Sequence, residues 1–454
     1  MSHFQKFEKI FSQDSLKEIF EEYISHKSST GIDNRTAFSF AKDLDNQVAI
    51  INRKVLDGTY KFSNYKQKLI SKGANKYPRV ISIPTVRDKL VLKTLQIFLH
   101  QALDKQHVNL ETPQALTRKV KKSLANPEFD KVLKLDISEF YPSIRHKELK
   151  SNLGKFFRTE KQIIIGLIIK AIEAGTGAED KNEKGVPQGL AISNILAFIY
   201  FKNIDHRFSC ITLDIEYFRY VDDVMIIGKS SDVINAEQDF IKRCKKKGLN
   251  VHDRLKTPEK CVLLDKGDEF SFLGYLYYPK KPNFSKTAKP MISVKEQSLN
   301  KIRSSIVGLF ISFQRKKKSK EYLRWRLNLR ITGCIIDNTR KGWLAFFSEI
   351  DDLDILFTLD HFVEQMIKDE RFAVSKIDVQ PTSFVKTYHE MKYKQKHSTY
   401  IPNFDDFSIP AKAEVLKKLG ITFKANDDKD IDSKFWKAIR RETKDLDQDL
   451  LPLS

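Results

Sequence analysis

Hydrophobic positions recur along this chain with two different periods, which predict a mixture of helices and strands. One helical face of residues 15–24 is apolar, and Ser15 with Glu18 has the form of a capping box. Leucines at helical spacing occupy residues 92–103, and the apolar run 163–169 is too short to span a bilayer, so both predict buried helices. Residues 131–135 and 218–227 are rich in Val, Ile, Leu and aromatic residues, which is typical of strands.

Two adjacent carboxylates interrupt the apolar stretch 218–227. Tyr220 and Val221 precede Asp222 and Asp223, and more Val and Ile follow, so the pattern predicts two short strands joined by a tight turn. Mg²⁺ takes oxygen ligands and usually binds one or two carboxylates together with substrate phosphates. The hairpin tip is therefore a candidate metal site, although an acidic surface turn has the same local pattern.

Asp136 is another candidate site carboxylate, because it directly follows a predicted Val- and Leu-rich strand over residues 131–135. A carboxylate that leaves a sheet at the end of a strand can point at a ligand, and a helix cap is the alternative role. Asp136 lies 86 residues before Asp222, so only the fold can bring the two together. Tyr141, five residues further on, fits either a ligand site or the core.

A third segment, residues 185–194, combines glycines with a possible helix start. Gly185 and Gly189 flank Pro187 and Gln188, and glycines let the backbone approach a ligand closely. Ser193 can begin the apolar helix that follows. A loop that enters a helix in this way suits a nucleotide or base-pair surface, although Pro-Gln-Gly alone is also an ordinary turn.

The chain is strongly basic, with a formal net charge of +21 and a pI near 9.5, which favours a polyanionic partner. From residue 401 onward, ten Lys and Arg stand beside eleven Asp and Glu, so about +22 lies in the first 400 residues. We expect the nucleic-acid surface there. Basic residues lie on both sides of the short apolar strand that starts at Arg79: Lys72, Lys76, Arg79 and Arg87. They could bind a triphosphate, or they could form a solvent-exposed basic loop.

The four cysteines are far apart and lack zinc-type spacing, which predicts reduced structural thiols. The N-terminus has no apolar run suited to a signal peptide. We therefore expect a cytoplasmic protein without a membrane partner.

In their order and spacing, three segments together resemble the palm of a reverse transcriptase: Asp136-Ile-Ser-Glu-Phe-Tyr141, Gly185-Val-Pro-Gln-Gly189 with Ser193, and Tyr220-Val-Asp-Asp223. The resemblance extends to residues 79–84 in the fingers and 270–274 at the end of the palm. It implies an α+β right-hand polymerase fold with four parts. These are an N-terminal helix (1–30), fingers and palm (31–290), a helical thumb-like domain (291–375) and a C-terminal extension (376–454).

The resemblance also implies an RNA-directed DNA polymerase, a nucleotidyltransferase that uses two Mg²⁺ ions, with Mn²⁺ as an alternative, to join dNTPs into a DNA product. The implied metal ligands are Asp136, Ile137, Asp222 and Asp223. Arg79 and Lys76 would hold the triphosphate, Gln188, Gly189 and Tyr220 would line the nascent base pair, and Tyr141 would act as a gate against the 2′-hydroxyl. Lys260 is the candidate proton donor to pyrophosphate, with Lys256 as its competitor.

Residues 330–348 and 400–405 are similar to stand-alone bacterial antiphage reverse transcriptases. Such enzymes copy a dedicated noncoding RNA, and several form homo-oligomers. Ser193-Asn194 departs from the Ser-Pro common in intron-encoded enzymes. A group II intron-type maturase and an RNA-templated RNA polymerase are the alternatives, whereas the acidic triad argues against a non-catalytic RNA-binding scaffold.

Overall fold

The computed structural model describes residues 2–25, 29–71, 77–103, 111–157, 161–210, 214–280, 289–394 and 398–446. The chain divides into two compact units. Unit 1 comprises residues 1–111 and 128–265, and unit 2 comprises residues 112–127 and 266–454. The two units are defined by compactness, so they do not test the predicted division into fingers, palm, thumb-like domain and C-terminal extension. That division stays a prediction.

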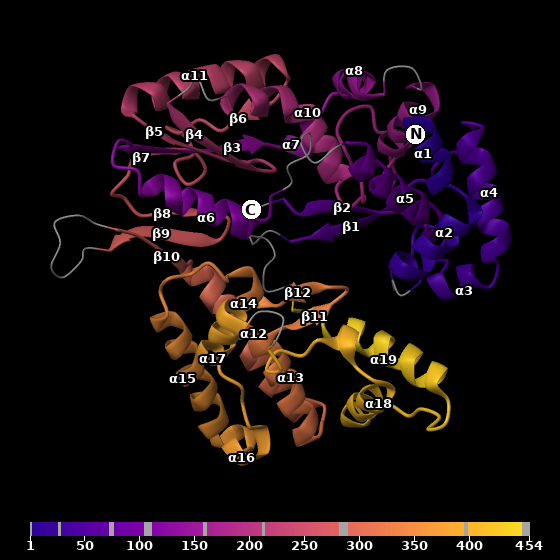
Figure 1. Cartoon of the computed structure of the whole chain (residues 1–454), viewed down its shortest axis with the longest axis vertical. Helices are drawn as coiled ribbons and strands as arrows, with labels where there is room; N and C mark the ends of the chain where they lie inside the picture. The colour runs from indigo at the N-terminus through magenta and orange to yellow at the C-terminus, as the bar shows by residue number, and fades with distance from the viewer. Residues whose placement is uncertain are drawn as a thin grey trace. The chain divides into compact units, whose positions relative to one another are not determined.

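Unit 1 mixes helices with antiparallel strands, as the two hydrophobic periods predict (Figure 1). Its elements are α1 (His3–Ile10), α2 (Gln13–Ile19), η1 (Phe20–Ile24), α3 (Ala37–Ala41), α4 (Leu44–Leu56), β1 (Lys66–Ile70), β2 (Arg79–Ile83), α5 (Val86–Ala102), β3 (Lys131–Ser138), α7 (Phe140–Ser143), α8 (His146–Phe156), α9 (Lys161–Glu173), α10 (Ser193–Phe208), β4 (Ile215–Tyr220), β5 (Asp223–Gly228), α11 (Ser230–Lys246), β6 (Asn250–Val251) and β7 (Val262–Asp265).

A five-stranded antiparallel sheet forms the centre of unit 1. Its strand order is β4-β5-β3-β6, and β7 pairs with β3 over residues 131–134. Helix α11 packs on β3 and β5 and lies along the sheet in Figure 1, while α10 contacts β4. Residues 224–227 of β5 are fully buried, because apolar neighbours cover both faces of that strand. The site residues therefore sit on a rigid sheet.

The N-terminal region holds two short helices and a π-helical turn where one helix was predicted. Helix α2 starts earlier than expected because Ser12, not Ser15, is its N-cap; the Ser12 hydroxyl accepts a hydrogen bond from the Ser15 backbone N–H at 3.4 Å. The apolar face predicted for residues 15–24 is confirmed, since Leu16, Phe20 and Ile24 are buried. This region packs on α5, the predicted leucine helix.

Unit 2 contains a small sheet, a hairpin and a set of helices. Its elements are α6 (Pro113–Leu124), β8 (Phe270–Phe272), β9 (Tyr275–Lys280), β10 (Lys289–Val294), α12 (Glu296–Arg315), α13 (Lys320–Thr332), β11 (Cys334–Ile336), β12 (Thr339–Lys341), α14 (Trp343–Phe346), α15 (Asp354–Lys368), η2 (Glu370–Phe372), α16 (Lys376–Val379), α17 (Phe384–His389), η3 (Glu390–Lys394), η5 (Phe404–Asp406), α18 (Ile409–Lys418) and α19 (Asp428–Glu442).

Gly274 lies in a tight turn between two strands. Strands β8 and β9 form a hairpin, and Leu273 and Gly274 make its turn with φ values of 52° and 81°. Both residues have a positive φ, which glycine adopts without steric cost. Gly274 therefore suits this turn, and its carbonyl also accepts a hydrogen bond from the backbone N–H of Lys295 at 3.4 Å.

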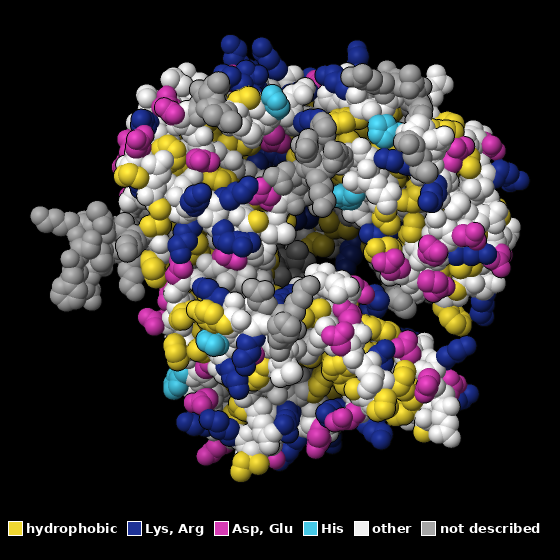
Figure 2. Space-filling model, viewed as in Figure 1, with side chains coloured by type: hydrophobic (Ala, Val, Ile, Leu, Met, Phe, Trp, Pro, Cys, Tyr) yellow, Lys and Arg dark blue, Asp and Glu magenta, His cyan; other side chains and the backbone are white. Residues whose placement is uncertain are grey.

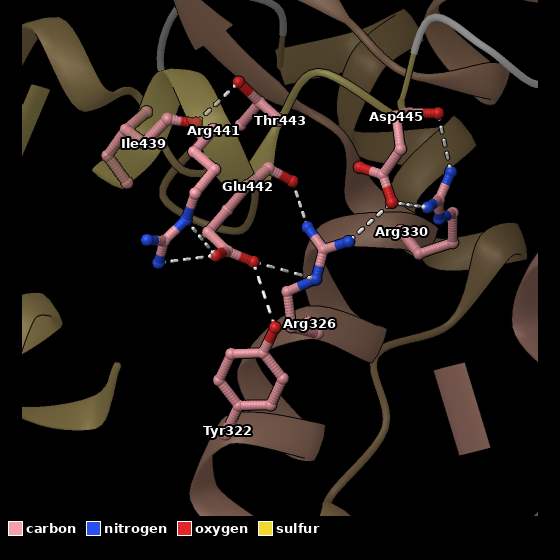
Figure 3. A network of polar contacts seen from close by, with 8 residues as sticks. All are labelled: Tyr322, Arg326, Arg330, Ile439, Arg441, Glu442, Thr443 and Asp445. Atoms are coloured by element: carbon pink, nitrogen blue, oxygen red, sulfur yellow. Dashed lines mark hydrogen bonds and ion pairs between the residues drawn. The ribbon is translucent and has the colours of Figure 1, made fainter. Parts of the chain in front are cut away.

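The C-terminal helices of unit 2 are tied to α13 by buried charge (Figure 3). Arg326 on α13 pairs with Glu442 at 3.5 Å and with Asp445 at 2.6 Å, and Arg330 also pairs with Asp445. Tyr322 donates a hydrogen bond to the Glu442 carboxylate at 3.1 Å. We call these residues the C-terminal arginine network.

The molecular surface is rich in charge of both signs. Figure 2 shows Lys and Arg side chains scattered over the visible face, with Asp and Glu between them. Within the part of the chain that the structure describes, no helix has both the length and the apolar character needed to cross a membrane.

Candidate active site

The carboxylates of Asp222 and Asp223 stand at the predicted hairpin turn. Strands β4 and β5 pair up to Tyr220 opposite Asp223, so Val221 and Asp222 form the turn itself. Val221 has a φ of 58°, a left-handed conformation that a β-branched residue rarely adopts. The turn is therefore strained and needs support from its surroundings.

Arg219 supplies part of that support from behind the turn. Its Nη1 donates a hydrogen bond to the Val221 carbonyl at 2.8 Å, and its other guanidinium nitrogens pair with the Asp205 carboxylate on α10, with Nε at 2.7 Å. The Arg219 side chain is 8% exposed, and Tyr217 also donates to Asp205. Sequence reasoning missed this pair, because no local pattern connects residues 205 and 219.

The fold brings Asp136 to the same turn. On β3, Asp136 is directly opposite Asp223, and the backbone N–H of Ile137 donates to the carbonyl of Asp222 at 3.2 Å. Asp136 does not end its strand as expected, because β3 continues to Ser138 by pairing with β6. One antiparallel ladder thus brings Asp136 to the turn, although it lies 86 positions before Asp222 in the sequence.

Two basic side chains contact Asp136. The Nζ of Lys260 lies 2.8 Å from Asp136 Oδ2, and the Nε2 of His252 lies 3.6 Å from Oδ1. Lys256, the competing lysine, is exposed in the turn before Lys260. His252 was not predicted, since a single histidine after a short strand gives no signal in the sequence.

Burial and repulsion between carboxylates disfavour the ionised forms of Asp222 and Asp223 when no cation is bound. Burial and the charge of Asp222 raise the pKa of Asp223 to about 7. Burial, together with the charge of Asp136, also raises the pKa of Asp222. Burial tends to lower the pKa of Lys260, but the hydrogen bond and charge of Asp136 outweigh it and raise that pKa. The cluster therefore attracts cations.

The predicted substrate residues gather around this cluster from other elements. Burial raises the pKa of Asp222 and of Tyr141. Arg79, at the start of β2, is close enough for its positive charge to offset part of that increase. Tyr141, on the short helix α7, donates a hydrogen bond to Asn194 Oδ1 at 2.6 Å. Tyr220 is 37% exposed beside the turn. Lys76 and Lys72 lie outside the described residues.

The loop that carries Gln188 and Gly189 packs on β2. The Ser82 backbone N–H donates to the Gln188 carbonyl at 2.8 Å. Gly189 has a φ of 101°, and a Cβ there would lie 2.8 Å from Ile81 Cγ2. The close approach that this glycine permits is therefore to β2. Helix α10 begins at Ser193, as predicted; Ile192 holds the N-cap position, and the Ser193 hydroxyl donates to the Pro187 carbonyl at 2.7 Å.

The chemistry of the donor set fits a hard divalent cation. Asp136 and Asp222 offer carboxylate oxygens, and the pKa of Asp222 is raised by burial and by the charge of Asp136, both of which a bound cation would offset. Among the described residues, no group of three or more His, Cys, Asp or Glu side chains has the arrangement of a self-sufficient metal site. The carboxylate oxygens of Asp136 and Asp222 suit Mg²⁺, which usually binds one or two carboxylates together with substrate phosphates.

Comparison with known proteins places a family domain over this site. Residues 70–277 match the family described as reverse transcriptase (RNA-dependent DNA polymerase), a range that begins in β1, ends in β9 and includes Asp136, Asp222, Asp223 and Lys260. No curated protein matches the chain. A solved structure of apo telomerase from Candida tropicalis, truncated from its C-terminal domain, is similar with a TM-score of 0.41 and 19% identity. The match covers 52% of this chain and 55% of that one.

Proposed function

We propose that residues 70–277, which match the reverse transcriptase family, are the polymerase domain of a chain that copies RNA into DNA by nucleotidyl transfer. The observation that carries the proposal is the convergence of Asp136 with Asp222 and Asp223 across the β3–β5 ladder. Nucleotidyl transfer needs little covalent work from protein groups, so positioning and charge neutralisation are the main tasks of the site.

Asp136 and Asp222 would hold divalent ions, with the main chain of Ile137 beside them and Asp223 in support. When bound, such ions neutralise charge on the triphosphate and lower the pKa of the primer hydroxyl. Asp136 now accepts a hydrogen bond from Lys260. Lys260 occupies only Oδ2 of Asp136, so Asp136 could still offer a ligand oxygen, and the Lys260 ammonium group would lie close enough to donate a proton to the departing pyrophosphate.

The surrounding residues would bind and select the incoming nucleotide. The Arg79 guanidinium matches phosphate oxygens with its fork of donors. Tyr141 would lie against the 2′ edge of the sugar and exclude ribonucleotides, and Tyr220, Gln188 and Gly189 would border the new base pair. Packing of the 185–194 loop on β2 would hold these groups in register.

We further propose that the template is a dedicated noncoding RNA and that the activity serves defence against phage. Support comes from the resemblance of residues 330–348 and 400–405 to stand-alone antiphage enzymes. In the structure, both segments belong to one compact element: Asp405 accepts hydrogen bonds from the backbone N–H groups of Asp337 and Asn338 at 2.9 and 2.8 Å. We also propose that the chain forms a homo-oligomer, because several of the enzymes that it resembles do so.

The test is polymerisation by the purified protein on a primed RNA template, with dNTPs and NTPs offered separately. We expect dNTP incorporation that requires Mg²⁺ or Mn²⁺; extension only with NTPs would instead favour an RNA polymerase. Sequencing of the co-purified RNA distinguishes the finer proposals, since a short structured RNA supports defence and an intron RNA supports a maturase. Protection from phage should disappear in Asp222→Asn.

A further inference from the structure

The ring of Tyr141 is fixed from two sides, and the contact at its hydroxyl end involves a residue without an assigned role. The Tyr141 carbonyl accepts a hydrogen bond from the Val186 N–H at 2.9 Å, and the ring packs beside Phe140 with centroids 5.7 Å apart. At the far end of the ring, the hydroxyl donates to Asn194 Oδ1 at 2.6 Å. The orientation of the ring thus depends on Asn194.

Asn194 is well placed to hold a neighbouring side chain. It stands in the first turn of α10, and the preceding residue, Ser193, ties that turn to the 185–194 loop through its hydrogen bond to Pro187. Burial and the nearby charge of Asp222 raise the pKa of Tyr141, so its phenol stays protonated and remains a donor. A short amide side chain on a helix loses little further freedom when it accepts this bond.

We propose that Asn194 is a positioning residue for sugar selection: by holding the hydroxyl of Tyr141, it keeps the ring against the 2′ edge of the incoming nucleotide. The inference rests on the proposed polymerase function and on the gate role of Tyr141. Loss of the bond lets the ring turn about its side-chain torsions, which opens space for a 2′-hydroxyl without removing any catalytic group. Ribonucleotide use should therefore rise relative to deoxyribonucleotide use.

The experiment measures kcat/KM for a dNTP and for the matching NTP, and takes the ratio of the two. Asn194→Ala removes the acceptor and Tyr141→Phe removes the donor while keeping the ring. Each should shift the ratio toward ribonucleotides by about 3- to 10-fold, the scale of one net hydrogen bond. The double variant should shift it no further, because both changes break the same bond. Asn194→Asp keeps an acceptor and should retain the wild-type ratio within about twofold.

Controls separate this inference from the proposed function. Asn203→Ala changes an exposed asparagine on the same helix and should leave the ratio unchanged. A shift in Tyr141→Ala without a shift in Asn194→Ala would overturn the role of Asn194 and leave the gate in place. An unchanged ratio in Tyr141→Ala would overturn the gate itself. Equal loss of both activities in Asn194→Ala would show a structural role and also overturn the inference.

Discussion

The two units each bury a cluster of charge, and the two clusters are balanced differently. In the C-terminal arginine network of unit 2, two arginines that are 7% and 3% exposed meet two carboxylates at ion-pair distance. In the active site of unit 1, three carboxylates gather around one turn, and Lys260 makes the closest cationic contact with them. In the first cluster both carboxylates pair with arginines, whereas in the second the carboxylates repel one another and the pKa values of Asp222 and Asp223 stay raised.

This difference separates structural charge from functional charge. A buried ion pair with matched partners mainly specifies how elements pack. Unmatched carboxylates cost folding free energy, and the pKa values raised for Asp222 and Asp223 express that cost. Proteins keep such destabilising carboxylates at sites where a bound ligand supplies positive charge. The raised pKa values of Asp222 and Asp223 therefore support the proposal of a catalytic site here, independently of sequence motifs.

The largest effect is expected for Asp222→Asn in the unbalanced cluster. Loss of one metal-binding carboxylate removes several kcal/mol of transition-state stabilisation, so dNTP incorporation should fall by roughly 10³-fold or more. Binding of the RNA template, measured by fluorescence anisotropy, should be unchanged. Glu216→Gln changes an exposed carboxylate on the same hairpin and is the matched control. Substantial synthesis by Asp222→Asn would remove this residue from the catalytic site.

In the balanced cluster, we expect Asp445→Asn to act on stability. It removes the carboxylate that pairs with both Arg326 and Arg330, which should lower the free energy of unfolding by about 2–4 kcal/mol. Asp428→Asn, an exposed change on α19, should cost less than about 1 kcal/mol. Denaturant titration followed by circular dichroism measures both. Equal stability of the two variants would mean that the C-terminal arginine network is not a structural clamp.

The contact between Lys260 and Asp136 predicts a smaller catalytic effect. Lys260→Ala should lower kcat for dNTP incorporation by about 10²-fold, the lower end of the range for a general acid, with little change in the KM for the dNTP. Lys256→Ala, in the same loop, should behave like the wild type. If Lys256→Ala is the slower variant, the proton donor has been assigned to the wrong lysine.

The smallest predicted effect is on the free energy of unfolding when Asp223 loses its charge, and its sign is opposite to that of Asp445→Asn. In metal-free buffer, Asp223→Asn relieves repulsion from Asp222 and Asp136 and should raise the free energy of unfolding by about 1 kcal/mol, whereas Asp445→Asn lowers it. Thermal unfolding of both variants in EDTA gives the comparison. Destabilisation by Asp223→Asn would show that its carboxylate is already balanced by other groups.

The sequence predicted the active-site elements well because their signals are local. Runs of apolar and aromatic residues on both sides of Asp222 and Asp223 define a hairpin, and the run 131–135 defines the strand that carries Asp136. Register cannot be read in this way, so neither the opposition of Asp136 and Asp223 nor the continuation of β3 to Ser138 was evident. The contacts of Arg219, His252 and Asn194 depend on partners distant in sequence, and the C-terminal arginine network joins residues more than a hundred positions apart.

The account depends most on Asp136 and Asp222 acting together as ligands of divalent cations. Mn²⁺ binding, followed by electron paramagnetic resonance in the presence of primed RNA and a non-hydrolysable dNTP analogue, tests this directly. We predict that the tightly bound Mn²⁺ signal of the wild type is retained in Glu216→Gln and lost in both Asp136→Asn and Asp222→Asn. Undiminished Mn²⁺ binding in Asp136→Asn would contradict the account.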